Sequence, residues 1–168
     1  MIEAIIFDFG HTIMDELADR DIPLGTRPVK LMPRVLDVLP QIVLPMGIWA
    51  NTRTAREKEV RQYLMRAGIN KYFTWVVTSV DAGHRKPDSR FFDHALRISN
   101  LNADDVLFVG NQLNSDIQGA INQGIRCVWL SSETYRSPDD APESNRAKPT
   151  YTIATLAELP GLLRELQR

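Results

Sequence analysis

Cysteine is almost missing from the sequence, because Cys127 is the only one among 168 residues. A single cysteine excludes an internal disulfide and is typical of proteins that work in the reducing cytoplasm. The chain also has no apolar run long enough to cross a bilayer. Its N-terminus lacks the basic and apolar segments of a secretory signal peptide. We therefore expect a cytoplasmic protein that does not enter a membrane.

An excess of charge of one sign is missing too. The chain has 20 Lys and Arg and 21 Asp and Glu, which give a net charge of -1 at pH 7. Domains that bind nucleic acid carry a basic excess, so no nucleic-acid partner is indicated. Internal repeats and low-complexity tracts are also absent. We predict one domain over residues 1–168, a length sufficient to bury roughly 70% of the unfolded surface.

The chain does contain an alternation of strand-like apolar runs with helical patterns. Strands are predicted at residues 3–7, 46–50, 73–78, 106–109, 127–130 and 151–153. Helices are predicted at about 29–39 and 54–68, after residue 88, at about 114–124, and after residue 155, with a long loop at 131–149. Such an alternation predicts an α/β protein in three α/β/α layers, with a central parallel sheet covered by helices on both faces.

Three of the predicted helices have recognisable starts. Thr54 with Glu57, and Thr155 with Glu158, match the capping box, in which two side chains satisfy amides of the first turn. Asp88 is placed to cap the helix that follows it.

Polar residues follow the predicted strands where each one ends. Asp8, Asn51 and Asn111 end the first, second and fourth strands, Lys86 follows the third, and Asp116 opens the helix after the fourth. Ligands of open α/β sheets bind beyond the carboxyl ends of the strands, so these residues should gather at one edge. Taken alone, Asp8 could be a nucleophile, a metal ligand or the cap of a turn.

The ordered motifs resemble those of the haloacid dehalogenase-like (HAD) superfamily over nearly the whole chain. The family motif Asp-x-Asp-x-Thr/Val is matched by residues 8–12, Asp-Phe-Gly-His-Thr. The motif Gly-x-x-Lys-Pro is matched by residues 83–87, and the last motif by residues 110–116, Gly-Asn-Gln-Leu-Asn-Ser-Asp. The resemblance implies a HAD-like Rossmannoid fold and the hydrolysis of phosphate esters.

This resemblance implies roles for individual residues. Asp8 would be the nucleophile that takes up a phosphoryl group as an aspartyl-phosphate. Lys86 would hold that nucleophile and neutralise phosphate charge. The second motif is normally a serine or threonine but is Ala50-Asn51 here, so donation to the phosphate is assigned to the amide of Asn51. Substrate contacts are predicted for the neighbouring polar residues His11, Thr12 and Thr52.

The resemblance also implies a bound Mg²⁺. Its predicted ligands are Asp8, the backbone carbonyl of Gly10, Asn111 and Asp116. The family normally has an acid at the position of Asn111. An amide oxygen replaces a carboxylate in shape but not in charge, so the affinity for Mg²⁺ should fall.

Three family positions are altered in this sequence, namely Gly10, Ala50 and Asn111. Gly10 replaces the acid that protonates the leaving group and then activates water, help that is typically worth about 10²–10⁴-fold. Its loss predicts a slow enzyme unless another group substitutes. His11 could be that substitute, or merely a histidine in a loop.

The chain leaves no room for the cap domain that family members often insert. The intervals 12–45 and 51–86 are too short to carry a separate core. Such an open site suits a large substrate or one covered by a partner subunit. We therefore expect a small-molecule or macromolecular phosphoester as substrate, and the sequence leaves the oligomeric state open.

Three functions are compatible with these motifs. The leading hypothesis is a phosphomonoester phosphohydrolase that acts through Asp8, with slow or specialised activity. The alternative is a non-catalytic relative that binds a phosphorylated ligand or a protein. A haloacid dehalogenase ranks last, because those enzymes enclose their substrate with a cap and carry Ser-Asn where this chain has Ala50-Asn51.

Overall fold

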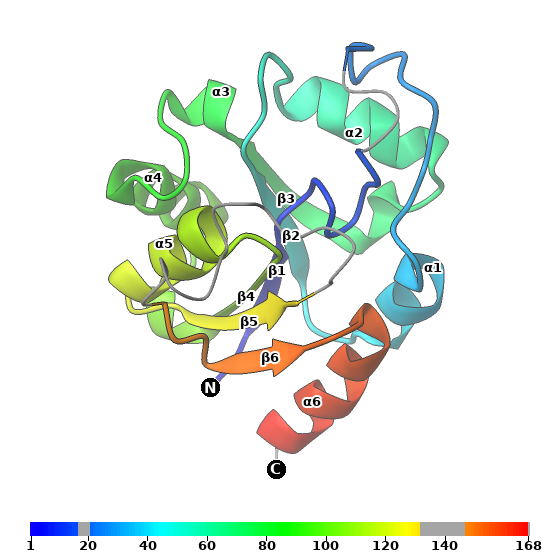
Figure 1. Cartoon of the computed structure of the whole chain (residues 1–168). Coiled ribbons are helices and arrows are strands. Elements are labelled where there is room, and N and C mark those ends of the chain that lie inside the picture. Colours follow the sequence, from blue (N-terminus) through cyan, green and yellow to red (C-terminus); the bar gives the residue numbers. More distant parts are fainter. Residues whose placement is uncertain (17–20, 132–146, 168) are drawn as a thin grey trace.

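The computed structural model of the chain describes residues 1–16, 21–131 and 147–167. These residues form one parallel sheet in the order β3-β2-β1-β4-β5-β6 (Figure 1). Its strands are β1 (Ala4–Phe7), β2 (Met46–Ala50), β3 (Phe73–Thr78), β4 (Val106–Gly110), β5 (Arg126–Leu130) and β6 (Tyr151–Ile153). Five of the strands are predominantly buried apolar runs, as parallel strands covered on both faces require. The predicted fold class is confirmed.

Helices cover both faces of this sheet. One face carries α1 (Val35–Val38), α2 (Glu57–Arg66) and α6 (Leu159–Leu166), and the other carries α3 (Ser79–Ala82), α4 (Ser89–Ser99) and α5 (Gln118–Asn122) (Figure 1). Short turns connect them, namely η1 (Leu39–Gln41), η2 (Asn70–Tyr72), η3 (Ala103–Asp105), the π-helical η4 (Leu113–Ile117) and η7 (Leu156–Glu158). Strand side chains alternate between the layers, so that Ile5 and Phe7 face α2 while Ile6 faces α4.

The order of the strands reverses at the centre of the sheet. From β1 the chain proceeds through β2 to β3 at one edge, and then returns to β4 beside β1 and continues to β6 at the other edge. Phe7 pairs with Val109, and the amide of Asp8 donates to the carbonyl of Val109 at 2.8 Å. The ends of β1 and β4 therefore lie side by side at a topological switch point, where ligands of open α/β sheets bind.

The predicted helix at 29–39 is shorter than expected, because α1 begins only at Val35. The preceding residues bind other parts of the chain instead. The backbone carbonyl of Lys30 accepts hydrogen bonds from the amide of Asp15 and from the hydroxyl of Tyr63. Leu31 forms an antiparallel bridge with Met14. These tertiary contacts hold the segment extended despite its helical pattern.

The predicted helix starts have different outcomes. The capping box of Thr54 with Glu57 is wrong, because α2 begins at Glu57 and Arg56 precedes it as N-cap. The capping box of Thr155 with Glu158 is confirmed, as is the cap by Asp88, whose carboxylate accepts a hydrogen bond from the amide of Arg90 at 2.9 Å.

The remaining predicted helix and loop also differ from the observed elements. The helix predicted at about 114–124 begins as the π-helical η4 and continues as α5, which ends before Gly124. Most of the loop predicted at 131–149 lies outside the described residues.

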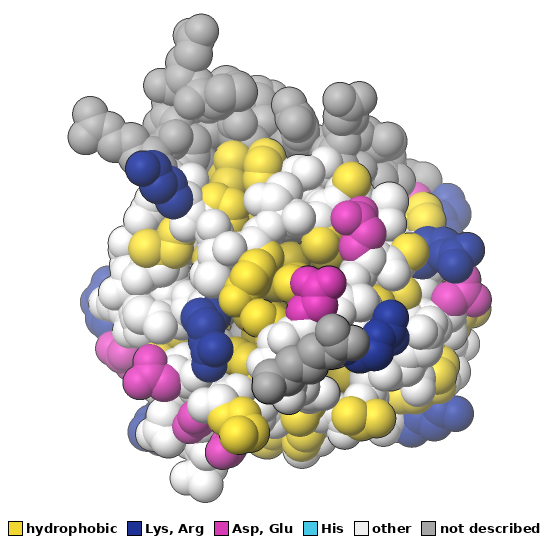
Figure 2. Space-filling model, turned by 90° about the horizontal axis from the view of Figure 1, so that it is seen from below, with side chains coloured by type: hydrophobic (Ala, Val, Ile, Leu, Met, Phe, Trp, Pro, Cys, Tyr) yellow, Lys and Arg dark blue, Asp and Glu magenta, His cyan; other side chains and the backbone are white. Residues whose placement is uncertain are grey.

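The surface mixes both signs of charge. Figure 2 shows Lys and Arg side chains interspersed with Asp and Glu around a central group of hydrophobic side chains. This face therefore presents no field of a single sign, in keeping with the net charge of -1. Among the described residues, no helix combines the length and the apolar character that crossing a membrane requires.

Candidate active site

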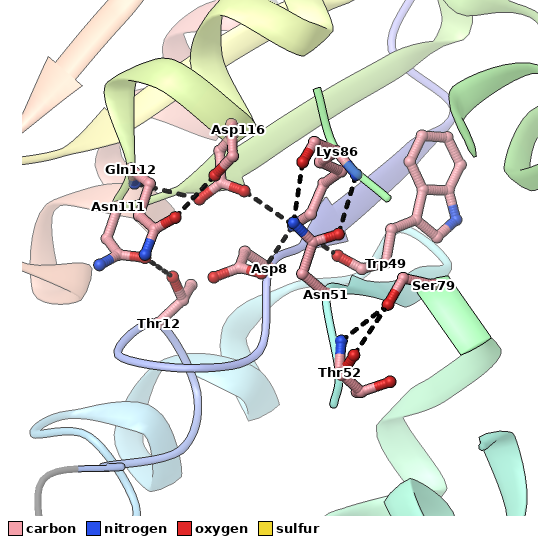
Figure 3. A network of polar contacts seen from close by, with 11 residues as sticks. Asp8, Thr12, Trp49, Asn51, Thr52, Ser79, Lys86, Asn111, Gln112 and Asp116 are labelled. Carbon is pink, nitrogen blue, oxygen red and sulfur yellow. Dashed lines mark hydrogen bonds and ion pairs between the residues drawn. The ribbon is translucent and has the colours of Figure 1, made fainter. Parts of the chain in front are cut away.

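Lys86 lies at the centre of a buried polar network beyond the carboxyl ends of the strands (Figure 3). Its ammonium group donates to Asp8 Oδ1 and to Asp116 Oδ1, at 2.7 Å each, and to the carbonyl of Trp49 at 2.9 Å. An ammonium group has three N–H donors, so each of them has an acceptor here. Lys86 thus brings together Asp8 and Asp116, which were expected at this edge of the sheet, and the carbonyl of Trp49, which was not expected there.

Asn51 fixes the backbone from which Lys86 extends. Its Oδ1 accepts from the amide of Lys86 at 2.8 Å, and its Nδ2 donates to the carbonyl of Lys86 at 2.9 Å. The amide of Asn51 is therefore engaged with the lysine loop rather than directed at a substrate. The structure makes it a positioning residue for Lys86, and the predicted donation to phosphate has no geometric support.

Asp116 supports the same ammonium group from η4. It is 1% exposed, and its second oxygen accepts from the amide of Gln112 at 3.0 Å. A Cβ at Gly110 would lie 2.6 Å from the Asp116 side chain, so only glycine allows this approach. Each carboxylate oxygen of Asp116 thus accepts one hydrogen bond, from Lys86 and from the Gln112 amide, and its role as a metal ligand stays a prediction.

The charges in this network do not balance, because two carboxylates share one ammonium group. Burial raises the pKa of Asp8 to about 7, with a further contribution from Asp116, although Lys86 acts in the opposite direction. Burial alone would lower the pKa of Lys86, but the attraction of Asp116 and Asp8 outweighs it and raises this pKa. Lys86 is therefore charged at neutral pH, and Asp8 is the group that gains or loses a proton there.

The second carboxylate oxygen of Asp8 lies close to the side-chain amide of Asn111. A terminal atom of the Asn111 amide lies 3.2 Å from both Asp8 Oδ2 and the carbonyl of Gly10. With Nδ2 in that place the amide donates to both oxygens, whereas with Oδ1 there three oxygens converge. Ligands about 2.1 Å from Mg²⁺ lie about 3 Å apart in an octahedron, so the spacing fits.

This donor set carries little negative charge for a metal site. Within the described residues, no group of three or more His, Cys, Asp and Glu side chains could hold an ion. The position of Asn111 is nevertheless well fixed, because Trp129 Nε1 donates to its carbonyl at 3.0 Å. The residues present therefore fit Mg²⁺ in geometry, with a weaker affinity than an aspartate at position 111 would give.

The three predicted substrate contacts lie in different environments. Thr12 is fully buried behind Asn111, and its hydroxyl lies 3.5 Å from Asn111 Oδ1. The hydroxyl of Thr52 donates to the carbonyl of Ala55 at 2.6 Å, although Thr52 does line the cleft. His11 is buried in a left-handed turn with φ of 56° and is not among the cleft-lining residues. Of the three, only Thr52 is placed to reach a substrate.

A cleft of about 690 Å³ opens beside this network. Its lining includes neighbours of the network, such as Phe9, Asn51 and Gln112. Three arginines and two acids also line it, namely Arg27, Arg53, Arg85, Glu16 and Asp21. The cleft thus lies beside the network that holds Asp8, and its lining carries one more positive than negative side chain, which suits an anionic substrate.

Glu16 is the residue of the site that sequence analysis missed. Its carboxylate lines the cleft, 4.0 Å from His11 Nε2 and 4.0 Å from Arg27 Nη1. The sequence contains several acids after the first motif without any period, so nothing in it distinguishes Glu16 from Asp15 or Asp21.

Comparison with known proteins places this geometry in a family. The haloacid dehalogenase-like hydrolase family matches residues 24–130. The chain is 31% identical over 170 residues to the pyrimidine 5'-nucleotidase YjjG of Escherichia coli, an alignment that covers 91% of this chain and 70% of that protein. It is 36% identical over 100 residues to the glyceraldehyde 3-phosphate phosphatase of Methanothermobacter thermautotrophicus, covering 60% of this chain and 43% of that enzyme.

The fold has a solved counterpart as well. The magnesium-bound HAD-hydrolase YfnB from Bacillus subtilis superposes with a TM-score of 0.76 at 19% identity, covering 96% of this chain and 98% of that one. The chain spans less than half the length of the glyceraldehyde 3-phosphate phosphatase that it matches. Because the family match extends over more than half of the chain and the nucleotidase similarity over nearly all of it, the chain belongs to the haloacid dehalogenase-like hydrolase family.

Proposed function

We propose that the protein is a phosphomonoester phosphohydrolase that works through an aspartyl-phosphate on Asp8. The observation that carries the proposal is the buried contact of Lys86 with Asp8 and Asp116 at the switch point of the sheet. This arrangement orients a carboxylate and supplies the positive charge that an incoming phosphoryl group needs. The names of the nucleotidase and the phosphatase support the same chemistry.

The proposed reaction has two displacements at phosphorus. A carboxylate oxygen of Asp8 forms a bond to phosphorus while the bond to the leaving oxygen breaks, and that oxygen gains a proton. Water then attacks the aspartyl-phosphate, which releases inorganic phosphate and restores Asp8. Lys86 holds Asp8 Oδ1 in place throughout and offsets the negative charge of the phosphoryl group.

Mg²⁺ is the cofactor that we propose, held by Asp8 Oδ2, the carbonyl of Gly10 and Oδ1 of Asn111. When bound, it would neutralise part of the charge on the phosphoryl oxygens. The magnesium-bound structural neighbour supports this choice of metal. Since Asn111 contributes no charge, we expect Mg²⁺ to bind about 10-fold or more weakly than it would with an aspartate at position 111.

The cleft points to a small-molecule substrate. Its volume of about 690 Å³ lies within the range of about 300–1,000 Å³ that is usual for sites of small molecules. The arginines of the rim, Arg53 and Arg85, would attract the phosphate or a second anionic group. We place this activity in the cytoplasm, in line with the single buried cysteine, Cys127.

The experiment that tests the proposal is phosphate release from a panel of small phosphomonoesters, measured with Mg²⁺ at about 100 times its Kd and again with chelator. Asp8→Asn removes the nucleophile while keeping the shape of the side chain. We expect release that needs Mg²⁺ and falls by about 10³-fold or more in the variant.

Two other outcomes would overturn the proposal. Ligand-dependent thermal stabilisation without turnover would indicate a non-catalytic binding protein. Halide release from haloacids that is indifferent to chelator would indicate a dehalogenase. Asp37→Asn, at a surface carboxylate that pairs with Arg34 and does not line the cleft, is the control for the chemical change.

A further inference from the structure

Position 10 is a glycine for reasons of space rather than of backbone conformation. Gly10 is not among the glycines with positive φ, so any L-residue could adopt its backbone. A Cβ placed there would lie 2.8 Å from both Cδ and Oε2 of Glu16, and 3.1 Å from Oε1. The carboxylate of Glu16 therefore fills the space that a side chain at position 10 would otherwise take.

This arrangement brings a carboxylate to the place of a missing one. The resemblance described above assigns to position 10 the acid that protonates the leaving group, and this chain has glycine there. The carboxylate of Glu16, six residues later in the sequence, lies where the side chain of that acid would begin. We propose that Glu16 is the general acid and base of the phosphohydrolase reaction proposed above, on which this inference rests.

Two nitrogen-bearing side chains flank the carboxylate of Glu16. Arg27 Nη1 lies 4.0 Å from Oε1, and His11 Nε2 lies 4.0 Å from Oε2. Arg27 is itself anchored, because its Nε and Nη2 donate to the carbonyl of Ile22 at 3.1 and 3.0 Å. The left-handed turn at His11 closes through its amide, which donates to the carbonyl of Met14 at 2.7 Å. The loop from Gly10 to Glu16 thus turns back, and the side chain of Glu16 lies beside Gly10.

Exposure distinguishes Glu16 from His11, the other candidate for this task. The Glu16 side chain is 31% exposed and lines the cleft, whereas the His11 side chain is 9% exposed and does not. A general acid must reach the leaving oxygen directly or through one water. His11 is therefore a positioning residue for Glu16, and Glu16 is the group that can touch the substrate.

The proton balance closes with Glu16 alone. As the bond between phosphorus and the leaving oxygen breaks, the protonated carboxyl of Glu16 passes its proton to that oxygen, and Asp8 becomes phosphorylated. In the second displacement the Glu16 carboxylate takes a proton from the attacking water, while the bond between Asp8 and phosphorus breaks. Glu16 is again protonated at the end, so no further reactant is needed.

The test compares leaving groups in Glu16→Gln, which keeps the size of the side chain. An alkyl phosphate needs a proton on its leaving oxygen, whereas p-nitrophenolate leaves without one. We expect kcat/KM to fall by about 10²–10⁴-fold for the alkyl ester and by about 10-fold or less for p-nitrophenyl phosphate. Loss of the base should also slow the second displacement, which a burst of p-nitrophenolate would report.

The matched control is Asp15→Asn, the same chemical change at the adjacent residue, which does not line the cleft. It should leave the ratio of the two kcat/KM values unchanged. Gly10→Ala offers a second route, because its methyl group would push the flexible end of Glu16 away and reproduce the selective loss. Gly10→Asp combined with Glu16→Ala should recover at least part of the activity on the alkyl ester, since it returns an acid to the vacated space.

The outcomes separate this inference from the proposed function. Turnover that depends on Asp8 together with an unchanged leaving-group ratio in Glu16→Gln would overturn the role of Glu16 alone. The absence of any turnover that depends on Asp8 would overturn both proposals. A selective loss on the alkyl ester, with recovery in the double variant, is the result that a merely structural Glu16 would not produce.

Discussion

Asp8 is a costly residue for the protein to bury in its ionised form. It shares the ammonium group of Lys86 with Asp116 at 2.7 Å each, and it is only 8% exposed. Burial, assisted by Asp116, raises its pKa to about 7 from an ordinary value of 3.8. A residue that serves chemistry often lowers stability in this way, because the charge needed by the reaction is expensive in the resting protein.

The first prediction at this scale is that Asp8→Asn stabilises the metal-free protein at pH 8. Because the pKa of Asp8 is higher in the folded than in the unfolded state, its contribution to stability is full below pH 3.8 and is lost as the pH rises through about 7. Asparagine is neutral at every pH and avoids this loss. We expect a gain of about 2–4 kcal/mol at pH 8.

The difference in the free energy of unfolding between the variant and the wild-type protein is measured by urea unfolding in the presence of chelator, at about one-unit steps from pH 5 to pH 8. Asp37→Asn, at a carboxylate that is 58% exposed, is the control and should follow the wild-type protein. Parallel pH dependences of the wild-type protein and Asp8→Asn would contradict the prediction, and would mean that Lys86 compensates both carboxylates fully.

Some residues of the site could be predicted from the sequence, and others could not. Asp8 directly follows β1, Lys86 lies in the loop between α3 and α4, and Asp116 lies in η4 after β4, so the topology of a parallel sheet brings them together. Glu16 depends instead on a turn through His11 that returns the chain over Gly10. That contact is made in space by a loop without periodicity, and no local pattern encodes it.

At the scale of elements, the start of α2 shows why a local capping pattern can mislead. The amide of Glu57 donates to Asp81 Oδ2 at 2.7 Å, so the first turn is capped by a residue 24 positions away. Asp81 also accepts from the hydroxyl of Thr78 at 2.7 Å and pairs with Arg56 at 2.9 Å. Sequence patterns describe caps within a few residues, and this carboxylate arrives from α3. The helix begins after Arg56, whose amide donates to Glu59 Oε2 at 2.9 Å, so Thr54 lies outside it and the predicted capping box does not form.

We therefore predict that Asp81→Ala lowers the free energy of unfolding by about 1–2 kcal/mol at pH 7. Burial would raise the pKa of Asp81, but the hydrogen bonds from Thr78 and Glu57 and the pairing with Arg56 lower it on balance. A carboxyl whose pKa is lowered in the folded state contributes stability above its unfolded value of 3.8 and loses it as the pH falls below that value.

Urea unfolding at pH 7 and at about pH 3 should thus show a difference between wild type and variant that shrinks in acid. Asp93→Ala, at an exposed position within α4, is the control and should change stability by about 0.5 kcal/mol or less. A variant as stable as wild type at pH 7 would show that Asp81 makes no net contribution to the start of α2.

At the scale of the whole molecule, the two helical layers are coupled through the sheet. Each strand sends successive side chains to opposite faces, so β1 contributes Ile6 to one core and Phe7 to the other. The three-layer fold could be predicted because the buried strands are apolar runs in the sequence and the longer helices carry an apolar stripe. The extents of short elements such as α1 could not, because contacts like that of Lys30 with Tyr63 decide them.

The three tryptophans lie on one side of the sheet, so their fluorescence can test the proposal that the chain folds as one domain. Trp49 is buried against Phe92 and Phe108, and Trp75 and Trp129 pack against the same core, on the face of α4. Leu64 is fully buried on the opposite face, in α2, so Leu64→Ala should cost about 2–5 kcal/mol there without touching a tryptophan.

Leu64→Ala leaves a cavity beneath α2, on the face opposite the tryptophans. If the sheet couples both layers, this cavity must destabilise the tryptophan side as much as the side of α2. We expect Leu64→Ala to shift the urea midpoint of tryptophan fluorescence and that of far-ultraviolet circular dichroism equally, with the two transitions remaining coincident. Met65→Ala, at a neighbouring position that is 60% exposed, should shift neither. A fluorescence transition that stayed at its wild-type midpoint while the dichroism moved would mean that the two faces unfold separately. The sheet would then separate two units that unfold independently, instead of forming the centre of one cooperative unit. The site at the sheet edge would then have to stay formed when the helices of one face unfold.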